Sequence, residues 1–217
     1  EPYAVRSAAP TPPAAPHPVT PLRHHQARVS QGNGVSLHVA QEVHGGSVLL
    51  SVPLSACLTA ADLPADHVAN GCLPRDDGYA RTLMTLLSML ETYDAGTADV
   101  RAQNLMAYHL AVASPELLLS SMMASWPESG ETAQLLANSV PYRRARAWRE
   151  AAVQEWRELR ARGLACTLDR YVWASLVMQT RAMHHPDAGH VLCPVLDLAN
   201  HASFGATARL VTAEGEL

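Results

Sequence analysis

The stretch Pro194–His201, PVLDLANH, contains the side chains of this chain that are best suited to bind a small polar ligand. It is an apolar run with one acid, Asp197, and it ends in the adjacent amide and imidazole of Asn200 and His201. An Asn-His pair at a turn can present a side-chain amide, a ring nitrogen and two backbone groups to one ligand. The pattern therefore indicates a ligand-binding corner after a buried segment.

The same stretch also fits a purely structural interpretation, a buried strand or a short helix that ends in a polar turn. In strand spacing, Val195 and Leu196 are expected in a core and Asp197 at a polar edge. Asn200 suits the turn because asparagine tolerates left-handed backbone and hydrogen-bonds its own neighbours. From the residues alone, both interpretations stay open.

A second candidate segment is Gln31–Gly34, QGNG. Its two glycines let the backbone bend tightly or let a ligand approach it closely, and an ordinary glycine turn is the alternative. The segment around it, Arg28–Pro53, alternates apolar and polar residues. That alternation predicts two short strands with Gly45-Gly46 as the turn between them.

Three stretches of the chain resemble, in the same order, motifs of SET-domain protein methyltransferases of the RuBisCO large-subunit methyltransferase-like branch. PVLDLANH resembles the Asp-x-x-Asn-His motif of that branch. Tyr171–Met183 resembles the Trp-Ala…Ser-Arg helix that precedes the motif, and Gln31–Pro53 resembles the Gly-x-Gly opening strand pair. Together these stretches extend over residues 28–210, which is most of the chain.

The resemblance implies S-adenosyl-L-methionine as the cofactor. Asn200 would bind the amino group of the cofactor, and His201 would meet the edge of its adenine. The amino-acid end of the cofactor would lie along the glycine segment, which comprises Gln31, Gly32, Asn33 and Gly34.

The resemblance also assigns roles near the end of the helix before the motif. Arg181 would pair with the cofactor carboxylate, since a guanidinium binds a carboxylate bidentately. Thr180 stands where the family usually has serine, and Asp197 would orient the motif internally as a structural acid. Without the resemblance, Arg181 equally fits a helix-end arginine that neutralises terminal carbonyls.

The activity implied is S-adenosylmethionine-dependent N-methylation of a protein lysine, or of a histidine. The family places its catalytic tyrosine beyond the position of Leu217, so we expect this segment alone to be inactive. The alternative is a non-catalytic SET-like module that serves as a protein-interaction surface. A third interpretation, a helical interaction domain unrelated to SET proteins, requires the three matches to be coincidental.

The predicted fold class is α+β, with a small β-strand SET core split by a large helical insertion. Residues 1–26 are rich in proline and alanine and are expected to be a linker or tail. The other predicted parts are an N-terminal SET half at 27–75, the helical insertion at 76–185, and the start of a C-terminal SET half at 186–217. A further strand is expected at Ala208–Val211.

Helical periodicity is clearest in the middle of the chain. Leu83, Leu86, Leu87 and Leu90 form one apolar face. Tyr142–Arg162 predicts a long amphipathic helix whose apolar stripe includes two tryptophans, and such a stripe is typical of a core.

Composition narrows the class of partner and the compartment. The 217 residues have 48% hydrophobic and 17% charged residues and a formal charge of −4, which argues against nucleic acid as the main partner. A protein substrate is what the resemblance implies. No apolar run reaches about 18 residues, which argues against a membrane partner. The four cysteines are scattered, so we expect a reducing intracellular compartment, namely the cytoplasm, a plastid or the nucleus. The oligomeric state is not indicated.

The segment His184–Cys193, HHPDAGHVLC, carries three histidines and a cysteine. Its spacing matches no standard zinc motif. Pro186, Asp187 and Gly189 predict a surface loop with solvated histidines, so no metal site is assigned.

Overall fold

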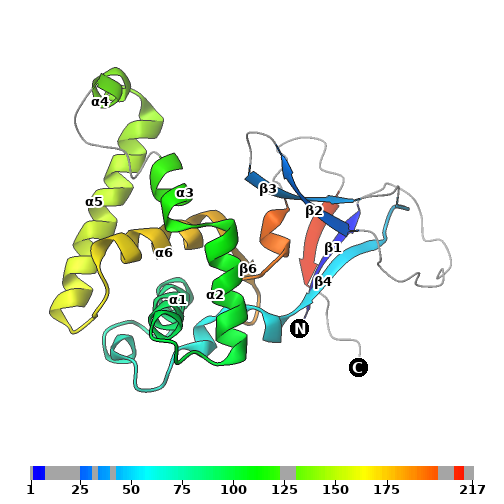
Figure 1. The fold of residues 1–217 in the computed structure, drawn as a ribbon, viewed down its shortest axis with the longest axis horizontal. Helices are drawn as coiled ribbons and strands as arrows, with labels where there is room; N and C mark the ends of the chain where they lie inside the picture. The colour runs from blue at the N-terminus through cyan, green and yellow to red at the C-terminus, as the bar shows by residue number, and fades with distance from the viewer. Residues whose placement is uncertain are drawn as a thin grey trace.

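The structure is a computed structural model that describes residues 2–7, 25–30, 34–39, 43–122, 131–199 and 208–212. Its helices gather on one side and most of its strands on the other (Figure 1). The arrangement is α+β, as the order of the sequence patterns predicts.

The first sheet brings the two ends of the described chain together. Strand β1 (Pro2–Ser7) lies between β4 (Val48–Pro53) and β8 (Ala208–Thr212) and pairs antiparallel with both. β8 confirms the strand expected after the Asn-His corner. The prediction of a linker or tail over residues 1–26 is wrong for Pro2–Ser7, because this segment is β1, the central strand of the sheet. Short strands at a chain end carry little local signal, since their pairing partners lie far away in sequence.

The second sheet is a hairpin of β2 (His25–Ser30) and β3 (Gly34–Val39). Ser30 pairs with Gly34, and residues 31–33 lie outside the described residues. The predicted turn at Gly45-Gly46 is present, and Gly46 has a φ of +85°. The strand after that turn, β4, does not pair with β3 as a simple hairpin would require; its described partner is β1.

The third sheet joins β5 (Leu58–Thr59), β7 (Gly189–Leu192) and β6 (Ala182–His185). The surface loop predicted for His184–Cys193 is wrong, because this segment forms most of the β6–β7 hairpin and His185 is fully buried. The apolar residues Val191 and Leu192, also fully buried, draw the hairpin into the core. The rings of His184 and His190 meet edge to face.

Six α-helices are described between β5 and β6 in the sequence. They are α1 (Gly78–Asp94), α2 (Val100–Val112), α3 (Pro115–Ser121), α4 (Glu131–Leu136), α5 (Val140–Ala161) and α6 (Leu168–Arg181). Three short 3₁₀ helices precede them, η1 (Leu54–Ala56), η2 (Ala60–Asp62) and η3 (Val68–Gly71). Among the described residues, no helix is both long and apolar enough to span a membrane.

The helix boundaries follow local signals in the sequence. The hydroxyls of Ser114 and Thr167 accept hydrogen bonds from backbone N–H groups at the starts of α3 and α6. Gly163, with a φ of +105°, follows the end of α5, where a left-handed residue stops the helix.

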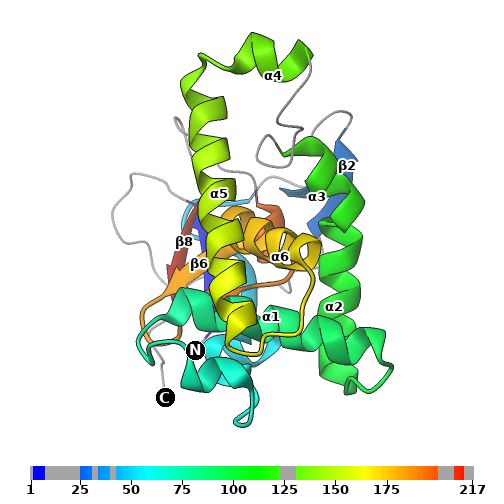
Figure 2. The same cartoon turned by 90° about the vertical axis from the view of Figure 1, so that its left-hand side faces the viewer.

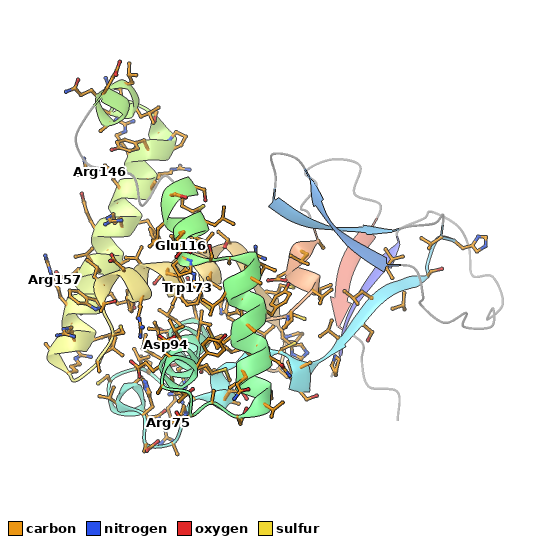
Figure 3. All side chains as sticks on the ribbon, viewed as in Figure 1. Arg75, Asp94, Glu116, Arg146, Arg157 and Trp173 are labelled. Carbon is orange, nitrogen blue, oxygen red and sulfur yellow. The ribbon has the colours of Figure 1, made fainter. Side chains whose placement is uncertain are left out.

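Helix α6 forms the centre of the helical block and packs against α1, α3 and α5 (Figure 2). Its Trp173 lies in the interior, and the indole N–H donates to the carbonyl of Ala113 at 2.7 Å (Figure 3). On α5, Ala152 and Leu159 are buried and the two tryptophans of the stripe are partly buried against the core. The prediction that this stripe belongs to the core is confirmed.

Candidate functional site

The candidate site lies where the C-terminal end of α6 meets the 3₁₀ helix η5 (Leu196–Leu198). Arg181 is the last residue of α6, and its Nη1 donates to Oδ2 of Asp197 in η5 at 3.0 Å. The side chain of Asp197 is fully buried, and that of Arg181 is 16% exposed. This ion pair joins the end of the helical block to the predicted ligand-binding corner.

Helix α2 supplies a third member of the network. The phenol of Tyr108 donates a short hydrogen bond to Oδ1 of Asp197. The same phenol oxygen accepts the backbone N–H of Val195 at 2.8 Å. Both oxygens of the Asp197 carboxylate are therefore engaged, and the chain entering η5 is held at two points.

Arg181 also binds the end of α2. Its Nη2 donates to the carbonyl of Val112, the last residue of that helix, at 2.9 Å. A cation at a helix C-terminus is favourable because it neutralises the unpaired carbonyls. The third guanidinium nitrogen, Nε, is buried and has no hydrogen-bond partner within the described part of the chain.

Burial sets the electrostatics of this network. Burial raises the pKa of the Asp197 carboxyl, while the hydrogen bond from Tyr108 and the charge of Arg181 oppose that rise. The pKa of Tyr108 is raised, first by burial and then by its bond to Asp197. His109, the next residue of α2, is fully buried, and burial together with the Arg181 charge lowers its pKa to about 4.

The backbone at the corner differs from the strand predicted there. Val195 is 38% exposed and has a φ of +69°, and Asp197 is buried, so the expected core and edge positions of these two residues are wrong. The N–H of Asp197 bonds to the carbonyl of Cys193 at 3.1 Å. That tight turn replaces strand alternation and rotates Val195 outward. The alternative interpretation, a short helix, describes η5.

Strand β3 of the second sheet and the 3₁₀ helix η5 are neighbours in the fold. Gly34 begins β3, and β3 lies in contact with η5, which Figure 1 shows in orange between the helices and the β2–β3 hairpin. Gln31, Gly32, Asn33, Asn200 and His201 lie outside the described residues. Their roles in cofactor binding stay predictions.

Thr180 and Arg181 have partners within the protein. The Thr180 hydroxyl donates to the carbonyl of Leu176, one turn back in α6, at 2.7 Å. The contact of Arg181 with a cofactor carboxylate stays a prediction, and its ion-pair partner in the structure is Asp197. Its bond to Val112 matches the helix-end interpretation, although the helix is α2 and not its own.

Sequence reasoning missed Tyr108 and His109. A signal for His109 was present, since it shares a helical face with Ala102, Leu105 and Met106, all buried. A histidine on such a face must lose its hydration or find a partner. For Tyr108 no sequence signal existed, because its partners lie more than eighty residues away along the chain.

No protein-family model matches the chain, and no curated protein matches its sequence. One solved structure does match, a crystal structure of the SET domain of LSMT bound to lysine and AdoHcy. The match has a TM-score of 0.62 at 18% identity and covers 85% of this chain. The chain has the fold of a SET domain. It spans 42% of the length of that structure, and the SET fold accounts for strands on both sides of a helical insertion.

Proposed function

We propose that the protein is an S-adenosylmethionine-dependent protein N-methyltransferase that acts on a lysine, or on a histidine, of another protein. The observation that carries the proposal is the contact between β3 and η5 within a SET fold. Gly34 is the first residue of β3, and Asn200 comes two residues after η5 in the sequence, so this contact supports a common binding place for the two segments assigned to the cofactor. The matching structure holds lysine and AdoHcy, a substrate-type amine and a cofactor-type thioether.

The chemistry of the donor set fits such a cofactor. An amide, an imidazole and glycine-rich backbone suit the amino-acid and adenine ends of S-adenosylmethionine. The Nε–H of Arg181, which has no hydrogen-bond partner among the described residues, is one further donor at the same corner. When bound, the cofactor supplies a methyl group on a sulfonium. The residues of this chain bind and orient it and exclude water.

Methyl transfer to an amine needs a neutral nucleophile and an in-line approach. With a reference pKa near 10.4, deprotonating a lysine at pH 7.4 costs about 4 kcal/mol. A narrow dry channel lowers that cost, because burial disfavours the ammonium form. Holding amine and methyl in line contributes most of the remaining acceleration. Such a site requires no nucleophile-base pair.

In this proposal the Tyr108–Asp197–Arg181 network positions the site and does not react. It fixes η5 against α2 and α6. The three motif resemblances support placing the protein in the RuBisCO large-subunit methyltransferase-like branch. They also support an intracellular location, in the cytoplasm, a plastid or the nucleus.

A non-catalytic SET-like interaction module is the second candidate. One observation favours it: the two α6 side chains assigned to the cofactor, Thr180 and Arg181, both have partners within the protein. In an interaction module those contacts would be the whole role of the two residues.

Two measurements separate the candidates. Calorimetric titration with S-adenosylhomocysteine is expected to show saturable binding to one site. Protein extract is incubated with the intact protein and methyl-labelled S-adenosylmethionine and is then analysed for methyllysine and methylhistidine. All 16 basic residues of the 217 are arginine, so none of the labelled methyllysine lies within this part of the protein. No binding contradicts the methyltransferase, and binding without transfer by the intact protein favours the module.

A further inference from the structure

Two cysteines face each other across the β5–β7 ladder. Cys57 directly precedes β5, and Cys193 directly follows β7. The strands are antiparallel, with Leu58 opposite Leu192. One step outward along the ladder, Cys57 therefore stands opposite Cys193.

The burial pattern shows that both thiols point to the same face. Leu58 and Leu192 pack into the main helical core, whereas Cys57 and Cys193 share a second buried cluster. This alternation is that of a strand pair, in which neighbouring side chains point to opposite faces. Opposite residues in an antiparallel pair have Cα atoms about 4.5–5.5 Å apart, which lies within the range of about 4.4–6.8 Å that a disulfide needs. Both thiols are free and 0% exposed.

The two sulfurs are in different environments. The interaction between the two thiols lowers the pKa of Cys57, against the effect of its burial, and raises the pKa of Cys193. The Cys57 thiol also donates to the carbonyl of Pro53 at 3.6 Å. The Arg101 guanidinium lowers the pKa of Cys57 further; it binds the carbonyl of Cys57 and pairs with Asp62 at 3.0 Å. Thiolate character, which makes a cysteine nucleophilic, is therefore concentrated on Cys57.

We propose that Cys57 and Cys193 are a redox modification site that a peroxide converts into an intramolecular disulfide. The Cys57 thiolate attacks one oxygen of hydrogen peroxide, the O–O bond breaks, and Cys57 becomes a sulfenic acid. The departing hydroxide takes up the proton that Cys57 released and leaves as water. The Cys193 sulfur then attacks the sulfenic sulfur, the S–O bond breaks, and hydroxide leaves with the Cys193 proton as a second water. Two thiols and one peroxide thus give one disulfide and two waters.

The disulfide would link the two chain segments that enter and leave the helical block. Cys57 and Cys193 lie on either side of the segment that contains α1 to α6. Cys193 also accepts the N–H of Asp197, so the cross-link attaches β5 to the residue that opens the candidate corner. Cross-linking across so long a segment restricts the unfolded chain, and we expect the oxidised protein to melt at a higher temperature.

The test treats the native chain with hydrogen peroxide and maps its cysteines by mass spectrometry. Trypsin alone leaves Cys57 and Cys72 in one peptide, because no arginine lies between them and the chain has no lysine. Adding a protease that cleaves before aspartate separates them at Asp62. The expected product is a peptide containing Cys57 joined to one containing Cys193, two hydrogen atoms lighter than the sum and split by dithiothreitol.

Variants make the assignment specific. The variant Cys72→Ser/Cys166→Ala keeps only the proposed pair of cysteines. On oxidation, its mass is expected to fall by two hydrogen atoms and its melting temperature is expected to rise. The matched variant Cys72→Ser/Cys193→Ser keeps Cys57 and Cys166 and is expected to form no intramolecular link. In native unmodified protein, a bulky thiol reagent should label only Cys72, which is partly exposed. Separate sulfinic acids on Cys57 and Cys193, or a link that involves Cys72 or Cys166, would overturn the proposal.

Discussion

Arg181 and Asp197 form an ion pair at 3.0 Å that joins the last residue of α6 to the 3₁₀ helix η5, with the carboxylate fully buried. The Tyr108 phenol donates to the other oxygen of the Asp197 carboxylate, and the carbonyl of Val112 accepts a hydrogen bond from a second guanidinium nitrogen of Arg181. The pair therefore connects three elements at the place where the cofactor segments are expected to meet. Substitution of either residue of this ion pair is therefore expected to change the stability of the folded protein.

Asp197→Ala should lower the free energy of unfolding by about 3–5 kcal/mol, because Arg181 keeps its charge in a buried place without a counter-ion. Adding Arg181→Ala should cost less than the sum of the two single changes, since the double variant leaves no unpaired charge. Urea denaturation measures all three variants. Asp66→Ala, at an exposed aspartate, is the control and should change little. Additive losses in the cycle would contradict a coupled pair.

Tyr108→Phe should destabilise the protein by about 1–3 kcal/mol, because the buried Asp197 oxygen and the Val195 N–H both lose their phenol partner. Tyr93→Phe is the matched control, since its phenol has no hydrogen bond to any residue that the structure describes. Thermal unfolding of the two variants compares them directly. Equal melting temperatures would mean that the phenol of Tyr108 contributes nothing to the corner.

Val195→Gly should stabilise the protein by about 1 kcal/mol, because a β-branched residue is strained at a φ of +69° and glycine is not. Val195 is 38% exposed, so the substitution removes little buried surface. Val43→Gly, at a similarly exposed valine without positive φ, should be neutral or destabilising. Chemical denaturation gives both values, and a loss of stability at position 195 would argue against strain.

His109 should make the protein sensitive to acid. Its pKa in the folded state is lowered to about 4, below the unfolded value of 6.5, so the folded chain holds the neutral ring. This contribution is present above pH 6.5 and is lost as the pH falls toward 4, by about 3 kcal/mol in all. In His109→Gln the loss of unfolding free energy between pH 7 and pH 4 should shrink by that amount. His44→Gln, at an exposed histidine, should keep the wild-type profile.

Asn200→Ala in the intact protein should abolish binding of S-adenosylhomocysteine, because the amide assigned to the amino group of the cofactor is removed. Asn138→Ala, at an exposed asparagine, is the control and should bind normally. Calorimetry measures both affinities, and circular dichroism verifies that both variants are folded. An unchanged affinity in Asn200→Ala removes this residue from the site without affecting the network around Asp197.

Local patterns in the sequence were sufficient to predict the helical segments that became α1 and α5. The leucine face of α1, the tryptophan stripe of α5, and the caps Ser114 and Thr167 depend on neighbours within one or two turns. The order of strands, helices and strands also follows from periodicity, and with the motif resemblances it indicated the SET fold that the structural match supports.

Only the tertiary structure shows which residues distant in sequence pair in a sheet or share a hydrogen bond. A strand is completed by residues elsewhere in the chain, so nothing in Pro2–Ser7 alone identifies it as the centre of a sheet. The burial of Asp197, the outward turn of Val195 and the approach of Tyr108 follow from the packing of η5 against α2 and α6. Residue types and their spacing specify which groups are available for chemistry, but burial and long-range hydrogen bonds decide which of them meet.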